Sequence, residues 1–558
     1  MDRQTFAWGR SKNKIGGADR WMERLWVLGL FLAAILLFGI NLGVLPLRDW
    51  DEGTVAQVAR EIWQAKFDSL RWLYPTLGGT EYLNKPPLMH LLIAGAYAIG
   101  GVNEWTTRLP GALLSAACVP LLYGIGRELF RRRLPALFSA LIYLTLLPVV
   151  RHGRLAMLDG AVLCFFLFMM WCVLRSRRNL RYALGAGVGF GLICLTKGMM
   201  GLLLLNIALV FLAWDTPRLL TSLYFWIGLL LGSVPVAAWY GAQLLHYGQT
   251  FVNTGIFSQS LQRIWAPVEN HAGPPWYYLL EILKYGWPWL FLLPQGLRLA
   301  WENRNMSWAK LVLVWIGIYL VAISVMGTKL PWYVLPIYPA VALAGGAQLA
   351  EVWNAPSSKS YPRPWIPLLT VMGLLALSGS FYFAAFGPQP DWNLQLVFAS
   401  AALTLLITAV LVYQKDLQFI PLLFWGTYVT LLIFMTSPHW IWELAEAYPV
   451  KPVAAMIKRN TPIGKPIYTS YDHGRPSLNF YSDRQVIPAT EAELQQRWKD
   501  DAQPYFLLDQ PTFNELNLKP VKSINQAEGW LLITKRVAVR PAKSQKPQVR
   551  DKKADISQ

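Results

Sequence analysis

Two adjacent carboxylates stand directly after the first long apolar run of this chain, Asp51 and Glu52 in Trp50-Asp51-Glu52-Gly53. Apolar residues recur at helical spacing behind them, so the pair begins a predicted helix. An acidic side chain at a helix start is favoured by the helix dipole, which accounts for the pair without any function. The alternative is a catalytic carboxylate where the chain leaves the bilayer, placed to orient a substrate or to accept a proton from it.

A lysine precedes two prolines in Tyr82-Leu83-Asn84-Lys85-Pro86-Pro87. The residue before a proline is biased away from the helical conformation, so we expect extended backbone at Lys85. Two interpretations stay open. Lys85 either reaches towards the headgroups as an ordinary interfacial lysine, or it binds the phosphate of a lipid-linked substrate.

A third group of charges lies at the end of an apolar run, in Arg151-His152-Gly153-Arg154-Leu155-Ala156-Met157-Leu158-Asp159. Ionisable residues beside membrane helices are functional candidates, which makes Arg154 and Asp159 candidates for a functional site. A structural ion pair explains them equally well.

Further polar residues fall in turns and loops that we predict on the same side of the membrane. They are Lys197 in Thr196-Lys197-Gly198, Lys329 and Tyr333 in Gly327-Thr328-Lys329-Leu330-Pro331-Trp332-Tyr333, and Arg263, Glu269 and His271 in the loop 241–276. A single loop histidine is more often free of metal than bound to it. The chain has no GxxxxGK[ST] phosphate-binding loop, so no nucleotide cofactor is expected. The alternate glycines from Gly185 to Gly191 lie in an apolar run, where small residues let helices pack closely.

The composition is that of a membrane protein. Of the 558 residues 54% are hydrophobic and 15% are charged, whereas soluble domains average about 25% charged residues. This excludes a soluble cytosolic enzyme, a disordered scaffold and a disulfide framework, and the four cysteines all lie in apolar runs. A net charge of +19 can indicate a nucleic-acid partner, but here Lys and Arg form short clusters between apolar runs. That is the positive-inside pattern of a multi-pass protein, and no nucleic-acid binding is expected.

Charge also predicts the topology. Basic residues near the N-terminus, at Arg131, Arg132 and Arg133, and between Arg175 and Arg181 mark the cytoplasmic side. If the apolar stretch 86–100 crossed the membrane, the basic cluster at residues 131–133 would lie outside. We therefore predict that this stretch lies in the outer interface. Thirteen spans remain, with the N-terminus inside and the C-terminus outside. They are about 23–45, 108–128, 134–150, 159–175, 181–197, 199–214, 220–240, 277–299, 308–326, 331–351, 365–386, 393–413 and 418–436.

The predicted fold is therefore an all-α polytopic membrane protein with a small C-terminal α/β domain. Residues 1–436 form the membrane domain, with outer loops at 46–107 and 241–276; residues 437–540 form the α/β domain, and 541–558 a basic disordered tail. The topology places all the candidate residues on one outer face. Carboxylates mixed with several cations suit an anionic, lipid-linked substrate.

The motifs, taken in order, resemble the bacterial aminoarabinose transferases and the related protein O-mannosyltransferases, which are glycosyltransferases of the GT-C fold. The resemblance covers about residues 25–345, and after about 437 it is only generic. The motifs that carry it are Asp51-Glu52, Asn84-Lys85-Pro86-Pro87-Leu88, Arg108-Leu109-Pro110, Arg154-Leu155-Ala156-Met157-Leu158-Asp159, Leu195-Thr196-Lys197-Gly198 and Lys329-Leu330-Pro331-Trp332-Tyr333-Val334-Leu335-Pro336.

The resemblance implies a role for several of these residues. Asp51 would be the principal catalytic carboxylate and Asp159 a second one, while Lys85 would bind the donor phosphate with help from Tyr333 and Arg263. The remaining substrate-binding candidates are Glu52, Arg154, Lys197 and Lys329. His271 matches a family histidine that joins a glutamate in a metal site, but here Asn84 stands in the glutamate's place. That departure puts a divalent metal in doubt, and aminoarabinose as the sugar with it.

The function that follows is an inner-membrane glycosyltransferase with a polyprenyl-phosphate sugar as donor. A nucleophile of an envelope acceptor, a lipid A-like lipid or a glycan, would attack the anomeric carbon in one inverting displacement at the periplasmic face. A protein O-mannosyltransferase is the alternative within the family. A lipid or solute transporter is the rival from another class, although transporters place their broken or charged helices near the bilayer midplane.

Overall fold

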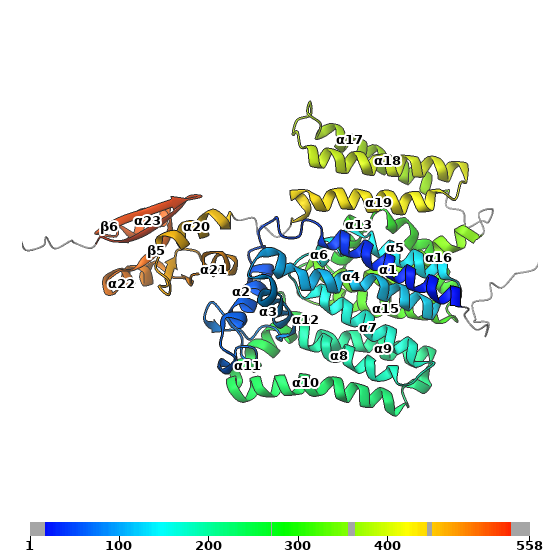
Figure 1. Cartoon of the computed structure of the whole chain (residues 1–558), viewed down its shortest axis with the longest axis horizontal. Helices are drawn as coiled ribbons and strands as arrows, with labels where there is room; N and C mark the ends of the chain where they lie inside the picture. Colours follow the sequence, from blue (N-terminus) through cyan, green and yellow to red (C-terminus); the bar gives the residue numbers. More distant parts are fainter. Residues whose placement is uncertain (1–16, 269–270, 355–362, 443–448, 537–558) are drawn as a thin grey trace, which may run out of the picture. The chain divides into compact units, whose positions relative to one another are not determined.

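The computed structural model describes residues 17–268, 271–354, 363–442 and 449–536 (Figure 1). The chain forms two compact units, divided between Tyr448 and Pro449. The predicted tail at 541–558 lies outside the described residues, as do the basic residues before position 17 and Glu269.

The first unit is helical throughout its membrane part, because long apolar runs can satisfy their backbone groups within lipid only as helices. Within the described residues, nine helices are long and apolar enough to cross a membrane, and one bent pair makes a tenth if it is a single span. The helices of this part are α1 (Gly17–Gly39), α4 (Glu104–Leu129), α5 (Arg133–Leu144), α6 (Leu147–Gly153), α7 (Asp159–Ser176), α8 (Tyr182–Lys197), α9 (Met200–Asp215), α10 (Leu223–Tyr247), α13 (Tyr277–Tyr285), α14 (Leu293–Glu302), α15 (Ser307–Val325), α16 (Tyr338–Asn354), α17 (Trp365–Tyr382), α18 (Trp392–Gln414) and α19 (Phe419–Thr436), with short 3-10 turns η2 (Pro217–Leu219), η4 (Trp289–Leu292), η5 (Pro331–Ile337) and η6 (Pro438–Trp440).

The all-α membrane architecture agrees with the prediction, but the count of thirteen spans is not confirmed. The predicted span 134–150 is the bent pair α5–α6, whose halves meet at 61°. The predicted span 277–299 is divided into α13, η4 and α14, with Pro288 at the division. A proline removes a helical hydrogen bond, which favours such a break. Helices α8 and α9, at 16 residues each, are shorter than an ordinary span.

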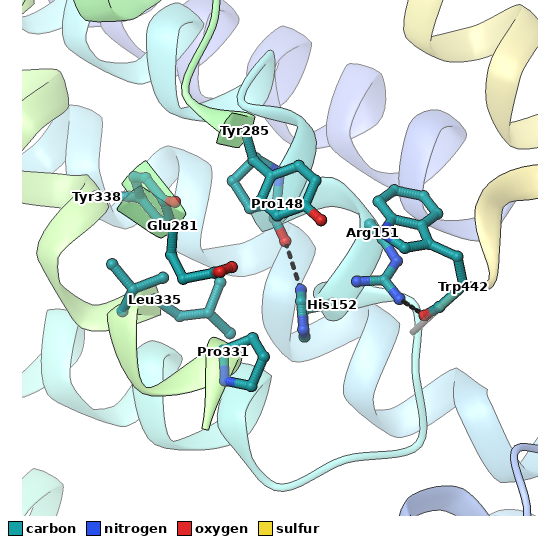
Figure 2. A pocket seen from close by; sticks show the side chains of 10 residues that line it. Pro148, Arg151, His152, Glu281, Tyr285, Pro331, Leu335, Tyr338 and Trp442 are labelled. Atoms are coloured by element: carbon teal, nitrogen blue, oxygen red, sulfur yellow. Dashed lines mark hydrogen bonds between the residues drawn. The ribbon is translucent and has the colours of Figure 1, made fainter. Parts of the chain in front are cut away.

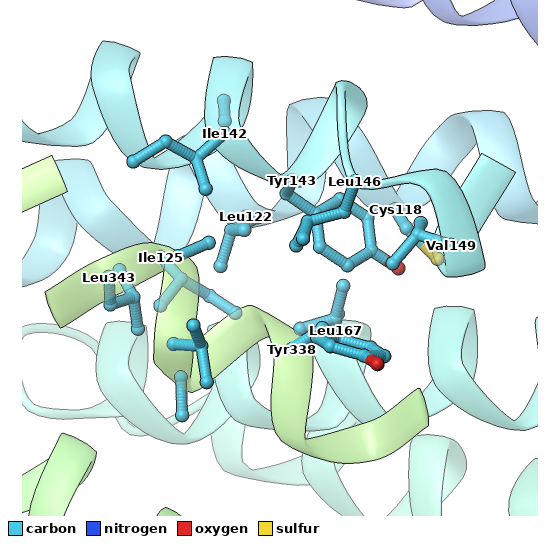
Figure 3. Packing of buried hydrophobic residues seen from close by; sticks show 14 of the residues in the cluster. Cys118, Leu122, Ile125, Ile142, Tyr143, Leu146, Val149, Leu167, Tyr338 and Leu343 are labelled. Carbon is cyan, nitrogen blue, oxygen red and sulfur yellow. The ribbon is translucent and has the colours of Figure 1, made fainter. Parts of the chain in front are cut away.

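The centre of the unit is packed around α4, which begins with a capping box at Asn103. Its buried face meets α1, α5 and α7, and Figure 3 shows Leu122 and Ile125 of α4 beside Ile142 and Leu343. Cys118 belongs to the same buried cluster, and all four cysteines are free and buried. Their burial agrees with their position in apolar runs of the sequence.

Helices α8 and α10 approach closely through glycines. A Cβ atom on Gly187 would lie 1.8 Å from the backbone oxygen of Gly228, and one on Gly232 would lie 1.9 Å from the oxygen of Gly187. The glycine run predicted to pack helices does so, and it fixes the position of Lys197 at the end of α8.

The basic clusters gather at one end of α4. Glu23 of α1 pairs with Arg127 and Arg133, each at 3.1 Å, and Glu128 pairs with Arg175 and Arg178 at 3.3 and 2.8 Å. Arg108, near the start of α4, lies about 30 Å away at 1.5 Å per residue. The residues predicted to face the cytoplasm are thus at the opposite end from Asp51 and Glu52, which contacts Arg108.

Two loop regions cover the end that carries the candidate residues. The first contains α2 (Asp51–Gln64), η1 (Phe67–Ser69), the hairpin β1 (Thr76–Leu77) and β2 (Thr80–Glu81), and α3 (Leu88–Gly100). Helix α3 is apolar but has only 13 residues, too few for an ordinary span. The second contains α11 (Gln249–Phe251), the π-helix η3 (Val252–Leu261) and α12 (Gln262–Trp265).

The second unit is the small α/β domain that the sequence predicts. Its sheet has the order β4-β3-β5-β7-β6, with β3 parallel to β4 and β5 and the other pairs antiparallel. Its elements are α20 (Val450–Asn460), β3 (Ile467–Thr469), α21 (Pro476–Ser482), β4 (Val486–Pro488), α22 (Glu491–Asp500), β5 (Tyr505–Asp509), α23 (Gln510–Leu516), β6 (Val521–Ala527) and β7 (Trp530–Lys535).

Candidate active site

Asp51 is the first residue of α2, and its side chain keeps 24% of its surface exposed. Its Oδ2 lies 3.6 Å from Nη2 of Arg48, which is itself buried. Burial raises the pKa of Asp51 to about 6, with the nearby carboxylates of Asp159 and Glu52 acting in the same direction and the cations Arg48 and Lys197 opposing it. A carboxylate with that pKa can exchange a proton near neutral pH.

Glu52 has a different environment, although it is the next residue. Its carboxylate accepts two hydrogen bonds from Arg108, at 2.7 and 2.8 Å, and two from the backbone N–H groups of Arg48 and Ala156, at 3.0 and 2.8 Å. Burial alone would raise the pKa of Glu52, but Arg108 and these hydrogen bonds hold it below its usual value. The Glu52 side chain has no exposed surface. Through these hydrogen bonds it joins α2, α4 and the segment before α7.

Arg154 is also held inside the protein. It donates to the carbonyl oxygens of Leu37, at 2.9 Å, and of Phe38 and Met435, both at 3.4 Å. Its guanidinium lies 4.4 Å from the ring centre of Trp440, which Arg108 also faces at 5.3 Å. The structure therefore places the guanidinium of Arg154, a predicted substrate-binding residue, among buried carbonyls and an aromatic ring.

Asp159 and Lys197 form the central ion pair of the site. Asp159 begins α7, Lys197 ends α8, and their Oδ1 and Nζ atoms are 2.6 Å apart. The Lys197 Nζ also lies 5.2 Å from the ring centre of Tyr333 in η5. Because Asp159 and Lys197 both act on the charge of Asp51, the two catalytic candidates and Lys197 share one electrostatic environment.

Lys85 and Lys197 line a single pocket. Its walls are the segment from Leu83 to Pro86, the end of α8, and residues of α10 and the second loop. Trp239, Tyr240 and Phe251 supply an aromatic side, with ring centres 5.0 to 5.8 Å apart. Two ammonium groups beside an aromatic wall suit a phosphate attached to an apolar chain.

Lys329 and Arg263 lie in segments that meet. The N–H groups of Gly327 and Thr328 donate to the carbonyls of Ile264 and Arg263 at 2.8 and 3.1 Å. The Lys329 ammonium donates to the carbonyls of Ile323 and Ser324, at 2.9 and 2.6 Å, and so caps the end of α15. Burial lowers the pKa of Lys329. Arg263, 9% exposed, donates to Gln259 at 3.1 Å.

His271 is held by hydrogen bonds to neighbouring backbone groups among the described residues. Its Nδ1 lies 3.2 Å from the carbonyl oxygen of Val268, and its own carbonyl accepts from the Lys329 N–H at 2.9 Å. Asn84 lines the pocket of the two lysines, where cations prevail. Across the described parts of the chain, no three His, Cys, Asp or Glu side chains are grouped as metal ligands would be.

The structure thus brings Asp51, Asp159, Lys197 and Tyr333 together and joins them through Lys197 to Lys85. It engages Glu52, Arg154 and Lys329 in internal contacts. Arg48 was not among the predicted site residues, although a charged residue at the end of the first apolar run is a signal for it. The aromatic wall and Trp440 were not predicted either, because only the tertiary fold brings them to the site.

Comparison with known proteins supports one family. Residues 84–240 match the model of the dolichyl-phosphate-mannose-protein mannosyltransferases. Over 378 residues the chain is 30% identical to an undecaprenyl phosphate-alpha-4-amino-4-deoxy-L-arabinose arabinosyl transferase of Pseudomonas fluorescens; the alignment covers 65% of this chain and 66% of that protein. The corresponding transferase of Aeromonas hydrophila is 26% identical over 395 residues, 68% of this chain and 71% of that protein.

Solved structures agree on the fold. The crystal structure of ArnT from Cupriavidus metallidurans bound to undecaprenyl phosphate superimposes with a TM-score of 0.74 at 18% identity, covering 91% of this chain and 98% of that one. The oligosaccharyltransferase of Archaeoglobus fulgidus gives a TM-score of 0.51 at 13% identity, covering 85% and 65%. With its two lysines and paired carboxylates at one end of a helical membrane unit, the chain belongs to the aminoarabinose transferase and protein O-mannosyltransferase superfamily of GT-C-fold membrane glycosyltransferases.

Proposed function

We propose that this enzyme transfers a sugar from a polyprenyl-phosphate donor to a lipid or glycan acceptor of the bacterial envelope. The observation that carries the proposal is the position of Lys197, which lines the pocket of Lys85 and also pairs with Asp159 beside Asp51. A single cation thus connects the phosphate-binding part of the site with its carboxylates. Names of relatives support the donor class, since the Pseudomonas protein is named as an undecaprenyl-phosphate arabinosyl transferase.

The proposed reaction is one displacement with inversion. An acceptor oxygen attacks the anomeric carbon, the bond from that carbon to the phosphate oxygen breaks, and the electron pair leaves with the polyprenyl phosphate. Charge grows on the leaving phosphate, so Lys85 and Lys197 supply stabilisation where the transition state needs it. The aromatic wall accepts the first part of the apolar chain.

Each carboxylate has a distinct part in this proposal. Asp51 is the catalytic carboxylate: it accepts the proton of an acceptor hydroxyl, or orients an acceptor phosphate, which needs no base. Asp159 holds Lys197, and Glu52 positions the turn that presents Asp51. Tyr333 and Arg263 are proposed to help bind the donor. No step requires a metal, so a chelator is expected to leave turnover unchanged.

The orientation of the enzyme belongs to the same proposal. The basic clusters face the cytoplasm, and the site and the C-terminal domain face the periplasm, where a donor in the outer leaflet can enter sideways. An envelope lipid or glycan is the proposed acceptor, and a protein hydroxyl is the alternative.

The test is turnover by the purified protein in lipid. Donor lipids and an envelope lipid extract are supplied, and free polyprenyl phosphate and the mass of the modified acceptor are followed by mass spectrometry. Wild type is expected to release polyprenyl phosphate and to add one sugar mass, and Asp51→Asn to bind donor without turnover. Asp391→Asn, which alters an acidic residue in the separate pair with His439, is the matched control and should behave as wild type. Equal turnover by Asp51→Asn would refute the catalytic role.

A further inference from the structure

A second pocket lies on another face of η5. It is lined by Pro148, Arg151 and His152 of α6, Glu281 and Tyr285 of α13, Pro331, Val334 and Leu335 of η5, Tyr338 of α16, and Trp442 (Figure 2). A 3-10 helix has about three residues per turn, so Pro331 and Val334 share a face that Tyr333 does not. Helix η5 therefore contributes Tyr333 to the Lys197 side and other residues to this pocket.

The pocket is formed where helices are interrupted. Helix α6 is the second half of the bent pair, α13 ends before the division at Pro288, and Tyr338 stands where η5 becomes α16. Irregular backbone at membrane depth is tolerated where it is buried in protein or lines a cavity. Three such interruptions around one pocket indicate a site built for a polar group.

Two buried polar atoms in this pocket have no protein partner among the described residues. His152 is 6% exposed, and its Nδ1 lies 3.1 Å from the carbonyl of Pro148. A carbonyl can only accept, so Nδ1 carries the proton and Nε2 of the neutral ring is an unpaired acceptor. Tyr338 is 1% exposed, and its hydroxyl is unpaired too. Burying such groups without a partner is unfavourable, and a bound group that pairs with them would offset that cost.

The charges around the pocket decide what kind of group it accepts. Glu281 is buried and accepts a hydrogen bond from Lys284 at 2.8 Å, and Figure 2 shows its carboxylate facing the same space as His152. Arg151 stacks on Trp442 at 3.7 Å and donates to the carbonyl of Trp440 at 3.2 Å. The lining contains one cation, Arg151, and one carboxylate, Glu281. Their charges balance, so neither an ammonium group nor an anion is favoured, and the unpaired acceptor further disfavours an anion. A neutral hydroxyl, which donates one hydrogen bond and accepts others, fits this lining.

The size agrees with a single group. The space open to a water-sized body is about 10 Å³, enough for about one water molecule or one hydroxyl. We propose that this pocket is a hydroxyl-binding subsite, in which one non-reacting hydroxyl of the acceptor's glycan headgroup donates to His152 Nε2 or Glu281 and accepts from Tyr338. The proposal rests on the proposed function in one respect, namely that the acceptor carries a glycan.

The experiment measures binding and not turnover, so that it can fail independently of the proposed reaction. Purified lipid A is titrated into the full-length protein in lipid nanodiscs, and binding of undecaprenyl phosphate is measured in parallel. Tyr338→Phe removes one oxygen and keeps the ring, while His152→Leu removes the acceptor nitrogen. Tyr428→Phe is the matched control, because its hydroxyl donates to Ala33 at 2.9 Å away from the pocket.

We expect Tyr338→Phe and His152→Leu each to weaken lipid A binding about 3- to 10-fold, the effect of one lost hydrogen bond. Affinity for undecaprenyl phosphate should not change, and Tyr428→Phe should match wild type in both titrations. Unchanged lipid A binding in both variants overturns the subsite, as does the absence of lipid A binding to wild type. A parallel loss of undecaprenyl phosphate affinity overturns it as well, since it would mark a structural defect. If wild type bound both lipids and the variants changed lipid A affinity as expected, but wild type released no polyprenyl phosphate in the turnover assay, the proposed function alone would be refuted.

Discussion

Asp51 and Glu52 are neighbours in the chain with opposite protonation behaviour. Four hydrogen bonds and Arg108 keep Glu52 charged, whereas burial and two other carboxylates raise the pKa of Asp51 to about 6. Two acids whose environments separate their pKa values commonly have separate roles. Asp51 is the one that can change protonation near neutral pH, and Glu52 is the one that fixes the turn.

The first prediction concerns pH. A raised pKa means that Asp51 takes up a proton as the pH falls through about 6, so its ionised form, the form able to act as a base, is lost on the acid side. For a hydroxyl acceptor we expect the rate to fall about tenfold from pH 7 to pH 5. Arg48→Met should move the midpoint to higher pH, because Arg48 stabilises the charged carboxylate. A profile that is flat between these values would contradict a base role and leave only orientation of the acceptor.

The second prediction concerns the two lysines of the phosphate pocket. Lys85→Met and Lys197→Met should each weaken binding of undecaprenyl phosphate about 10- to 100-fold, the usual effect of losing a hydrogen bond to a charged group. Lys197→Met should also reduce turnover of saturating donor, since it leaves Asp159 without its cation. Lys310→Met changes a cation paired with Asp215 at the basic end and is the control. Donor affinity that survives both substitutions would move the phosphate site elsewhere.

At the residue scale, the sequence predicted a group of charges that the structure brings together, but it did not predict the contacts of each one. Asp51, Lys85, Asp159 and Lys197 were selected because a charge beside an apolar run is conspicuous. The same signal selected Arg154, which the structure engages with buried carbonyls and Trp440. Trp440 is 286 residues further along the chain, and no local pattern predicts that contact.

At the scale of elements, one buried ion pair holds the loop of Asp51 against the membrane helices. Arg108 of α4 bonds Glu52 and also donates to the carbonyls of Leu42, Leu45 and Pro46. Removing one member of a buried pair leaves the other charge uncompensated and costs about 3 to 5 kcal/mol. The third prediction is therefore a large loss of thermal stability in Glu52→Gln and in Arg108→Leu.

The matched control for this pair is Arg298→Ala, which breaks an exposed pair with Glu302 at 2.9 Å. Exposed pairs contribute about 0 to 1 kcal/mol, so its unfolding temperature in detergent should stay close to that of wild type. If Glu52→Gln unfolded at the wild-type temperature, the buried ion pair of Glu52 and Arg108 would not stabilise the fold. Normal stability with impaired acceptor binding would return Glu52 to the substrate-binding role.

The fourth prediction uses the glycine contact between α8 and α10. Gly187→Ala would place a methyl group against the backbone of Gly228, so the helices must separate. We expect a loss of about 1 to 3 kcal/mol of stability and weaker donor binding, because α8 carries Lys197 and α10 carries Trp239. Gly241→Ala, also on α10, meets nothing within 4 Å and should stabilise by about 0.5 to 1 kcal/mol. Equal effects of the two changes would refute the close packing.

Element types were predictable and element interruptions were not. Hydropathy located α7 at Asp159–Ser176 against a predicted 159–175, because a continuous apolar run permits few alternatives. The 61° bend after α5 and the π-helix at Val252–Leu261 were not predicted from hydropathy. Both depend on how the neighbouring helices pack, which a local hydropathy pattern does not contain. The bend and the π-helix both contribute residues to the pockets. The structural details that could not be predicted are therefore the ones closest to the proposed sites.

At the scale of the whole molecule, the charged residues of the first unit form two groups at its opposite ends. Glu23, Glu128 and Asp215 pair with basic residues at one end of the first unit, whereas Asp51, Asp159 and Lys197 form the site at the other. Positive charge stays on the cytoplasmic side during insertion. An enzyme with this polarity would meet its donor in the outer leaflet.

The last prediction tests this polarity by labelling single cysteines in a background where the four native, buried cysteines are replaced. Asp68→Cys in the first loop and Ala492→Cys in α22 introduce exposed positions predicted to face the periplasm, and Asn179→Cys one predicted to face the cytoplasm. An impermeant maleimide added to intact cells should label the first two and reach the third only after permeabilisation. If α3 crossed the membrane, Asn179→Cys and Asp68→Cys would be labelled from the same side. That result would place the basic clusters after α4 on the outer side of the membrane. It would also contradict the odd number of crossings between the first loop and Arg131, on which the predicted orientation depends.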